Sequence, residues 1–246
     1  MLDSMPEGSE KCPLCGGNTW IFVDPNDNSK GVRRCECYQR GLIEGRIQRS
    51  GLSLALESCT FDSFKDTEPW QKTLKRKVEL YRNILTSAPL KKPWLFIGGN
   101  SGCGKTHLCT AICGELLKKG QNVRYMLWMA EVHDIKAAVN DEGYTALLQP
   151  YLTADVLYID DLLKSKGSRN LNPSDADIKI CFELLNGRYI RNLPTIISSE
   201  FYLDSELIAV DEATFSRVIE KTGSEFLISV DRNPDRNFRL KGVRKI

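Results

Sequence analysis

Residues 99 to 106 read GNSGCGKT, and this glycine-rich stretch constrains the fold more than any other part of the chain. It matches the pattern G-x-x-x-x-G-K-[ST] at every fixed position, a pattern that needs a strand before it and a helix after it. An apolar run, Trp94 to Ile97, precedes the stretch, and residues 108 to 119 have helical spacing. The alternative, a tight glycine turn without a ligand, does not account for this flanking strand and helix.

The stretch predicts a loop that binds polyphosphate, because successive backbone N–H groups and the helix N-terminus attract negative charge. Lys105 is expected to reach the β- and γ-phosphates of ATP, and the Thr106 hydroxyl to ligate Mg²⁺. The remaining residues expected along the nucleotide are Gly99, Asn100, Ser101, Gly102, Cys103, Gly104 and His107.

A second motif, VLYIDD, occupies residues 156 to 161, about fifty residues after the loop. Four apolar residues predict a central buried strand, and the carboxyl end of a parallel strand is where ligands bind in open sheets. We expect Asp160 to hold Mg²⁺ and Asp161 to polarise the attacking water. An apolar strand that ends in two acids is a weak signal alone, but it supports the phosphate loop.

Predicted strands and helices alternate after Leu90, which favours an α/β fold with a parallel sheet flanked by helices on both faces. A chain of 246 residues can hold one such domain and a small module. The expected strands after the loop are 123–127, 156–159, 194–199 and 226–230. The expected helices are 68–87, one or two within 130–148 that Pro150 ends, 175–191 with Ile178, Phe182, Leu185 and Tyr189 on its apolar face, and 206–221.

Two further features bear on the nucleotide. The strand 194–199 ends in Ser198-Ser199-Glu200, which would lie near the γ-phosphate if this strand neighbours the phosphate-loop strand; otherwise it is an ordinary core strand. Arg217 lies in a predicted helix, where arginine is usually a solvated side chain. In an oligomeric ATPase it could instead reach the γ-phosphate of a neighbouring subunit.

Four of the nine cysteines, Cys12, Cys15, Cys35 and Cys37, form a C-x-x-C and a C-x-C pair separated by nineteen residues. The pairs stand at the two ends of a predicted β-hairpin, followed by a helix over 38–50 that Gly51 ends. Four thiolates predict a closed structural Zn²⁺ site; the alternative is four unligated cysteines. We predict a zinc-binding module over 1–56 and an ATPase domain over 57–246.

Composition and charge limit the partners and the location that we expect for this protein. The net charge is about +2, so bulk charge does not by itself indicate a nucleic-acid partner. No apolar stretch reaches the length of a membrane span and the N-terminus lacks signal-peptide character, so we expect a cytoplasmic protein without a membrane partner. Trp20, Trp128 and Tyr158 could stack on bases, but each lies in or beside an apolar run and is expected in the core.

The chain resembles, over nearly its whole length, the bacterial and phage helicase loaders of the DnaC/DnaI type, which are AAA+ ATPases related to the IstB-type ATPases. The resemblance rests on successive blocks in the family order: the cysteine-rich module with RRCEC, TFDSF, GNSGCGKTHLCTAI with His107 after the loop threonine, VLYIDDL, PTIISSE, FSRVIEK and NFRLKG.

The resemblance implies that Lys105 and Thr106 contact ATP, that Asp160 and Asp161 serve Mg²⁺ and water, and that Arg217 is the arginine finger. The family usually ends its sensor strand in T-S-N, so Glu200 departs from the pattern, and a glutamate there needs a cation beside the γ-phosphate. We therefore expect either Ser199 to be the sensor or the enzyme to be a slow ATPase that DNA stimulates. The resemblance also suggests Arg239 as a second sensor and a reduced or absent helical lid.

As partners, the resemblance implies a hexameric replicative DNA helicase bound by the N-terminal module, single-stranded DNA bound by the ATPase domain, and ATP-dependent self-association. Lys136 is one candidate DNA contact. The expected function is ATP-dependent loading of the helicase onto single-stranded DNA during replication initiation. The alternatives are an IstB-like transposition ATPase that binds duplex DNA, and a helicase-binding adaptor without motor activity.

Overall fold

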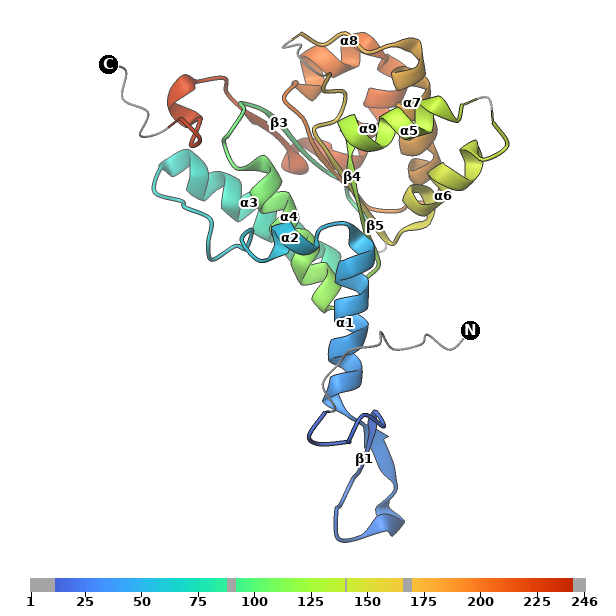
Figure 1. Cartoon of the computed structure of the whole chain (residues 1–246). Helices are drawn as coiled ribbons and strands as arrows, with labels where there is room; N and C mark the ends of the chain where they lie inside the picture. Colours follow the sequence, from blue (N-terminus) through green and yellow to red (C-terminus); the bar gives the residue numbers. More distant parts are fainter. Residues whose placement is uncertain (1–11, 88–91, 140, 166–169, 241–246) are drawn as a thin grey trace.

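The computed structural model describes residues 12–87, 92–139, 141–165 and 170–240, so the two ends of the predicted domains, 1–11 and 241–246, lie outside the described residues. The described chain has two parts (Figure 1). A body of helices around a sheet holds the phosphate loop, and a small hairpin lies away from it, at the far end of helix α1 (Glu36–Ser50).

The hairpin pairs β1 (Trp20–Phe22) with β2 (Val32–Arg34) in antiparallel register, joined through the short 3-10 helix η1 (Asn28–Lys30). The predicted hairpin is therefore confirmed. The expectation that Trp20 is a core residue is wrong, because 44% of its surface is exposed. A two-stranded sheet has no interior for an indole, and the Arg34 guanidinium covers the ring instead, 3.9 Å from its centroid.

Helix α1 ends at Gly51, as predicted, because this glycine adopts a left-handed φ of 83° at the C-cap. The short helix α2 (Ser53–Leu56) follows. Ser50 and Leu52 are buried in the body, and Arg124 donates a hydrogen bond to the Arg49 carbonyl across 3.1 Å. The end of α1 and the second half of α2 thus pack on the body of helices around the sheet, although the predicted boundary assigns them to the N-terminal module.

Five parallel strands form the sheet of the body, in the order β4-β5-β6-β3-β7. Their bounds are β3 (Leu95–Gly99), β4 (Val123–Leu127), β5 (Val156–Asp160), β6 (Thr195–Ser198) and β7 (Leu227–Val230). This confirms the predicted α/β class. It also places β6 directly between the phosphate-loop strand β3 and the acidic strand β5, which the sequence left open.

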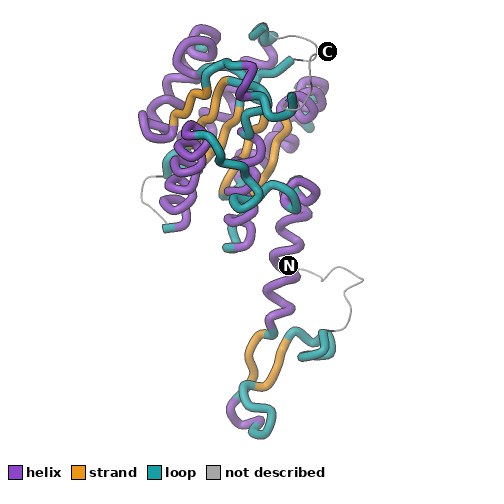
Figure 2. The backbone as a smooth tube through the Cα atoms, turned by 90° about the vertical axis from the view of Figure 1, so that its left-hand side faces the viewer, coloured by secondary structure: helices purple, strands orange, loops and turns teal. Residues whose placement is uncertain are grey.

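Helices cover both faces of the sheet (Figure 2), and alternate residues of each strand point to the two sides. One face packs against α3 (Pro69–Thr86) and α4 (Lys105–Lys118), with α1 and α2 at its edge. The other packs against α5 (Trp128–Ala137), α6 (Tyr144–Thr153), α7 (Asp175–Ile190), η2 (Leu203–Leu207), α8 (Ile208–Val210) and α9 (Glu212–Phe226). No helix among these described residues is long and apolar enough to cross a membrane.

Two helix predictions are wrong in detail. Pro150 does not end a helix but lies inside α6, which continues to Thr153. A proline costs a helix one backbone hydrogen bond. Here the buried side chains of Leu148 and Tyr151 hold the helix, and Arg188 donates to the Tyr151 carbonyl across 2.7 Å, which satisfies the helix end.

The predicted apolar face of α7 is wrong at Phe182, which is 38% exposed, although Leu185 is buried as predicted. The buried face runs through Asp177, Ile180, Cys181, Leu184, Leu185 and Arg188. Two ionisable residues occupy it because both have partners inside the body. Arg188 is fully buried and bonds Thr195 and three backbone carbonyls. A search for apolar periodicity cannot find such a face.

Candidate nucleotide site

The phosphate loop connects the end of β3 to the start of α4 and depends on three glycines in the left-handed region. Gly99, Gly102 and Gly104 have φ values of 100°, 70° and 97°. A Cβ atom on Gly99 would lie 2.0 Å from the Val230 carbonyl oxygen, so no other residue fits at the end of this strand. These glycines give the loop the shape in which backbone N–H groups can surround a phosphate.

Lys105 lies at the first position of α4 with its ammonium inside the loop. Its Nζ donates to the carbonyl oxygens of Gly99, at 2.9 Å, and Asn100, at 2.8 Å, and only 6% of the residue is exposed. The positive charge is therefore already placed where phosphate oxygens would enter, which is the position that the predicted role of Lys105 requires.

Asp160, at the end of β5, lies below the loop and is buried. Its Oδ1 accepts hydrogen bonds from the Thr106 hydroxyl, at 3.1 Å, and from the Ser198 hydroxyl, and its Oδ2 accepts from Tyr125, at 3.2 Å. Burial and the neighbouring carboxylate raise the pKa of Tyr125 above its usual range, which keeps the phenol a donor. A carboxylate beside a threonine hydroxyl is the donor set that Mg²⁺ prefers, so the residues fit the metal.

Asp161 and Glu200 are joined by a lysine that the sequence did not single out. Lys164 Nζ lies 2.9 Å from Asp161 Oδ2 and 3.0 Å from Glu200 Oε1. Partial burial alone would lower the pKa of Lys164, but the hydrogen bonds to both carboxylates outweigh it and hold that pKa above its usual value. Burial would raise the pKa of Glu200, yet Lys164 lowers it instead. A cation thus stands beside the unusual glutamate.

These groups surround an open cavity of about 280 Å³. Among the residues predicted along the nucleotide, the cavity is lined by Ser101, Gly102, Gly104, Lys105, Thr106, His107 and Asp161. Cys59, Lys164, Glu200 and Arg239 complete the lining. Gly99, Asn100 and Cys103 belong to the loop but do not line the cavity, and burial raises the pKa of the Cys103 thiol. The buried Asp160 does not line it either and lies behind Thr106, to which it is bonded.

Two residues predicted to contact the nucleotide, Ser199 and His107, form hydrogen bonds with other parts of the chain. Ser199 is fully buried, and its hydroxyl donates to the Leu162 carbonyl across 3.0 Å, so the structure does not bring it to the cavity. The neighbouring Ser198, which bonds Asp160, takes the place nearest the acidic strand. His107 lines the cavity with its ring but bonds the Thr60 carbonyl, at 2.8 Å, and so ties the TFDSF segment to α4.

The C-terminal segment after β7 covers the other side of the loop. Phe238 N–H donates to the Gly102 carbonyl across 3.0 Å, and Asn233 N–H donates to Asn100 Oδ1 across 3.0 Å. The described part of this segment contains only the 3-10 helix η3 (Pro234–Arg236) and turns, in keeping with a reduced lid. It carries Arg239 into the cavity lining.

Arg217 lies on α9, outside the cavity of its own chain. Its guanidinium stands 6.0 Å from the ring centroid of Phe182 and 5.9 Å from that of Tyr189, and it donates to the Ala213 carbonyl. The exposed Phe182 thus belongs to a surface shared by α7 and α9. The structure thus places Arg217 away from the cavity of its own chain, and its role as an arginine finger stays a prediction.

The four N-terminal cysteines converge. All four sulfur atoms lie within 4.8 Å of one another, with Cys12 and Cys35 at 3.8 Å. A tetrahedral zinc with bonds of about 2.3 Å places its sulfurs about 3.8 Å apart, so the cluster fits the metal. Hydrogen bonding from Cys15 and burial raise the pKa of Cys37 to about 12, whereas backbone hydrogen bonds lower that of Cys12 to about 7. Cys37 is therefore a thiol unless a cation is bound, and four thiolates at this spacing would need that cation.

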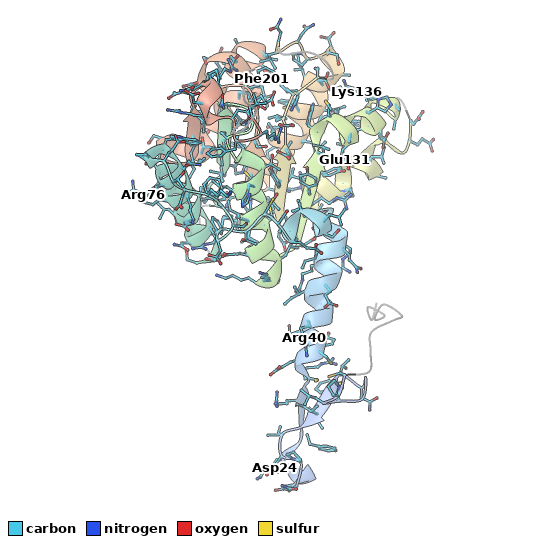
Figure 3. All side chains as sticks on the ribbon, turned by 60° about the vertical axis from the view of Figure 1, so that its left-hand side comes forward. Asp24, Arg40, Arg76, Glu131, Lys136 and Phe201 are labelled. Atoms are coloured by element: carbon cyan, nitrogen blue, oxygen red, sulfur yellow. The ribbon has the colours of Figure 1, made fainter. Side chains whose placement is uncertain are left out.

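Lys136, the candidate DNA contact on α5, is paired. Its Nζ lies 2.6 Å from Oδ1 of Asp177, whose side chain is only 11% exposed. Figure 3 shows Lys136 on the body, far from the hairpin, and Arg40 along the exposed part of α1. The ion pair ties α5 to α7, so the structure gives Lys136 a structural partner rather than a free charge.

Comparisons with known proteins agree with this architecture. The family model of the IstB-like ATP binding protein matches residues 90–218, more than half of the chain. YqaM of Bacillus subtilis is 31% identical over 76% of this chain and 59% of its own length. The phage-like element PBSX protein XkdC of the same organism is 29% identical over 85% of this chain and 79% of its own length.

Solved structures share the fold. A DnaC helicase loader superposes with a TM-score of 0.55 at 20% identity, over 73% of this chain and 99% of that one. The replication initiator DnaA, bound to AMPPCP and single-stranded DNA, superposes with a TM-score of 0.55 at 23% identity, over 74% of this chain and 52% of that one. The chain thus spans about three fifths of YqaM and about half of DnaA. With its phosphate loop, acidic strand and matching sequence, the chain belongs to the family of IstB-like ATP binding proteins.

Proposed function

We propose that this protein is an ATP-dependent loader that delivers a hexameric replicative DNA helicase to single-stranded DNA. The observation that carries the proposal is the combination of two parts in one chain. An ATPase body holds Lys105, Thr106 and Asp161 around one cavity, with the buried Asp160 bonded to Thr106, and a four-cysteine hairpin stands clear of that body on α1. A projecting module can bind a partner without covering the nucleotide.

In the proposed cycle, Lys105 holds the phosphates and Thr106 and Asp160 hold Mg²⁺. Asp161 polarises the attacking water, and Arg217 enters from a neighbouring subunit to stabilise the transition state. ATP would thus assemble the subunits and favour binding of single-stranded DNA. Hydrolysis would release the helicase. The position of Arg217 outside the cavity of its own chain, beside the exposed Phe182, supports a role between subunits.

The zinc module is proposed as the helicase-binding part. Its hairpin exposes several large apolar side chains, which favour contact with a protein partner. They are Leu14, Trp20, Phe22, Val23 and Val32. The fold shared with the DnaC helicase loader supports the choice of a helicase, and the fold shared with DnaA supports binding of single-stranded DNA by the body.

The test is size-exclusion chromatography with mass detection, in which the protein is mixed with the replicative helicase of its host, with and without ATP. A stable complex is expected, and its mass gives the stoichiometry. Lys105→Ala should lose nucleotide-dependent DNA binding and keep the helicase, whereas Cys12→Ser should lose the helicase and keep ATP. Joint loss of both activities in either variant would contradict separate roles for the two parts.

The family match favours one rival, a transposition-type ATPase that binds duplex DNA and partners a transposase. Such a protein should form no helicase complex and should prefer duplex over single-stranded DNA. The second rival, an adaptor without motor activity, should bind the helicase but show no ATP turnover stimulated by single-stranded DNA. The intact set of Lys105, Thr106, Asp160 and Asp161 argues against the adaptor.

A further inference from the structure

We propose that Lys164 is a γ-phosphate-binding residue of the nucleotide site, positioned by Glu200. The inference deepens the proposed ATPase function and rests on it. Lys164 lines the cavity together with Lys105 and Thr106. Its ammonium enters from the side of β5 and β6, whereas that of Lys105 enters from the phosphate loop.

The charges around the cavity explain why a cation is needed on this side. Asp161 and Glu200 are two carboxylates that face a space built for a polyanion. Their repulsion of a triphosphate would oppose binding unless a positive charge stood between them and the γ-phosphate. Lys164 lies within 3.0 Å of both carboxylates, so it occupies that position.

The geometry leaves Lys164 able to bind phosphate without releasing its partners. An ammonium has three N–H donors. Two are used by Asp161 Oδ2 and Glu200 Oε1 within the part of the chain that the structure describes. The third can donate to an oxygen of the γ-phosphate, and its direction is fixed by the other two.

This arrangement gives the glutamate at the end of β6 a role. A neutral polar side chain at this place could contact the γ-phosphate itself. Glu200 instead holds a flexible lysine stem in one position, at the carboxyl ends of two adjacent parallel strands. The same lysine contacts Asp161, so the γ-phosphate and the proposed water-polarising carboxylate share one cation.

The test measures the dissociation constants of AMPPCP and ADP, both with Mg²⁺, for the wild type and three variants. Lys164→Gln should weaken AMPPCP binding about tenfold and leave ADP binding unchanged, because a charge-assisted hydrogen bond to the γ-phosphate is lost. Lys72→Gln, an exposed lysine on α3, removes the same charge outside the cavity and should change neither constant.

The double variant Lys164→Gln, Glu200→Gln separates direct contact from charge neutralisation. If Lys164 contacts the phosphate, the double variant regains only the part of the AMPPCP affinity that repulsion by Glu200 cost, and it stays weaker than the wild type. Recovery of the wild-type preference would mean that Lys164 only neutralises Glu200, which overturns the inference. Equal loss of both nucleotides in Lys164→Gln, or no loss, also overturns it. A wild-type protein that binds neither nucleotide would instead overturn the proposed ATPase function, and this inference with it.

Discussion

The hydroxyl of Thr106 donates a hydrogen bond to Oδ1 of Asp160 across 3.1 Å, which joins the first turn of α4 to the end of β5. The other described donors to this carboxylate, Ser198 and Tyr125, are also neutral hydroxyls. None of these donors carries a positive charge, so a cation can still bind to this carboxylate. Helix α4 and the strands β4, β5 and β6 therefore meet at one carboxylate suited to Mg²⁺.

Thr106→Val tests this site, because valine keeps the shape of threonine and removes the hydroxyl. With Mg²⁺ present, the affinity for AMPPCP is expected to fall about tenfold, the loss of one metal ligand and one hydrogen bond. In excess EDTA, the variant and the wild type should bind equally. Calorimetric titration under both conditions measures the difference. An equal loss with and without Mg²⁺ would mean that the hydroxyl supports the loop rather than the metal.

The parts of the fold and of the nucleotide site that could be predicted are those that short sequence motifs determine. The phosphate loop and VLYIDD carry their function in short stretches, and the order of strands and helices between them determines the α/β class. The Lys164–Glu200 pair could not be predicted, because it depends on which strand lies beside β5. The contact of Phe238 with Gly102 joins segments that are distant in the chain. The sequence predicts Ser199 rather than Ser198 at the site, because a strand pattern does not show which of the two hydroxyls faces the acidic carboxylate.

Gly102→Ala tests the packing of the C-terminal segment on the phosphate loop. An added Cβ would lie 2.0 Å from Asn237 Oδ1, at a φ of 70° that alanine disfavours. We expect the free energy of unfolding to fall by about 1–3 kcal/mol. Gly143→Ala is the control, since its Cβ would meet nothing within 4 Å and its φ is −74°. Urea unfolding measures both, and equal stability of the two variants would contradict the close packing at Gly102.

Asp177→Asn tests the buried ion pair with Lys136, and its effect should depend on pH. Burial would raise the pKa of Asp177, but the hydrogen bonds from Lys136 and Ser174 hold it below the usual aspartate value of 3.8. The ionised carboxylate therefore stabilises the fold above pH 3.8, and this contribution is lost as the pH falls through the lower folded pKa. We expect a loss of about 2 kcal/mol at pH 7.

Urea unfolding of Asp177→Asn at pH 7, 5 and 3 checks the effect. The difference from the wild type should persist at pH 7 and 5 and shrink at pH 3. Asp175→Asn, an exposed acid in the same first turn of α7, is the matched control and should change stability little at any of these pH values. A difference that does not vary with pH would exclude the charge as its cause.

Removal of zinc should unfold the hairpin and spare the body. The described hairpin has little core, so its fold depends on the cysteine cluster, whereas the body has two hydrophobic clusters of its own. Chelation should make the chain susceptible to trypsin at the exposed Arg33 and Arg34 and leave the thermal unfolding of the body unchanged. Cys12→Ser should lose bound zinc, and Cys59→Ser should keep one ion per chain. Zinc retention by Cys12→Ser would exclude this four-thiolate site.

Arg217→Ala should bind ATP normally and hydrolyse it at least about a hundredfold more slowly, because an arginine finger acts on the transition state. Asp161→Asn should be similarly slow. If Arg217 acts on a neighbouring subunit, a mixture of the two variants contains interfaces with one intact site, and turnover should recover well above either variant alone. Arg191→Ala is the control, since Arg191, like Arg217, donates to the carbonyl four residues earlier, here across 2.9 Å, and is exposed. Failure of the mixture to recover, with both variants still binding ATP, would place the action of Arg217 outside the neighbouring site.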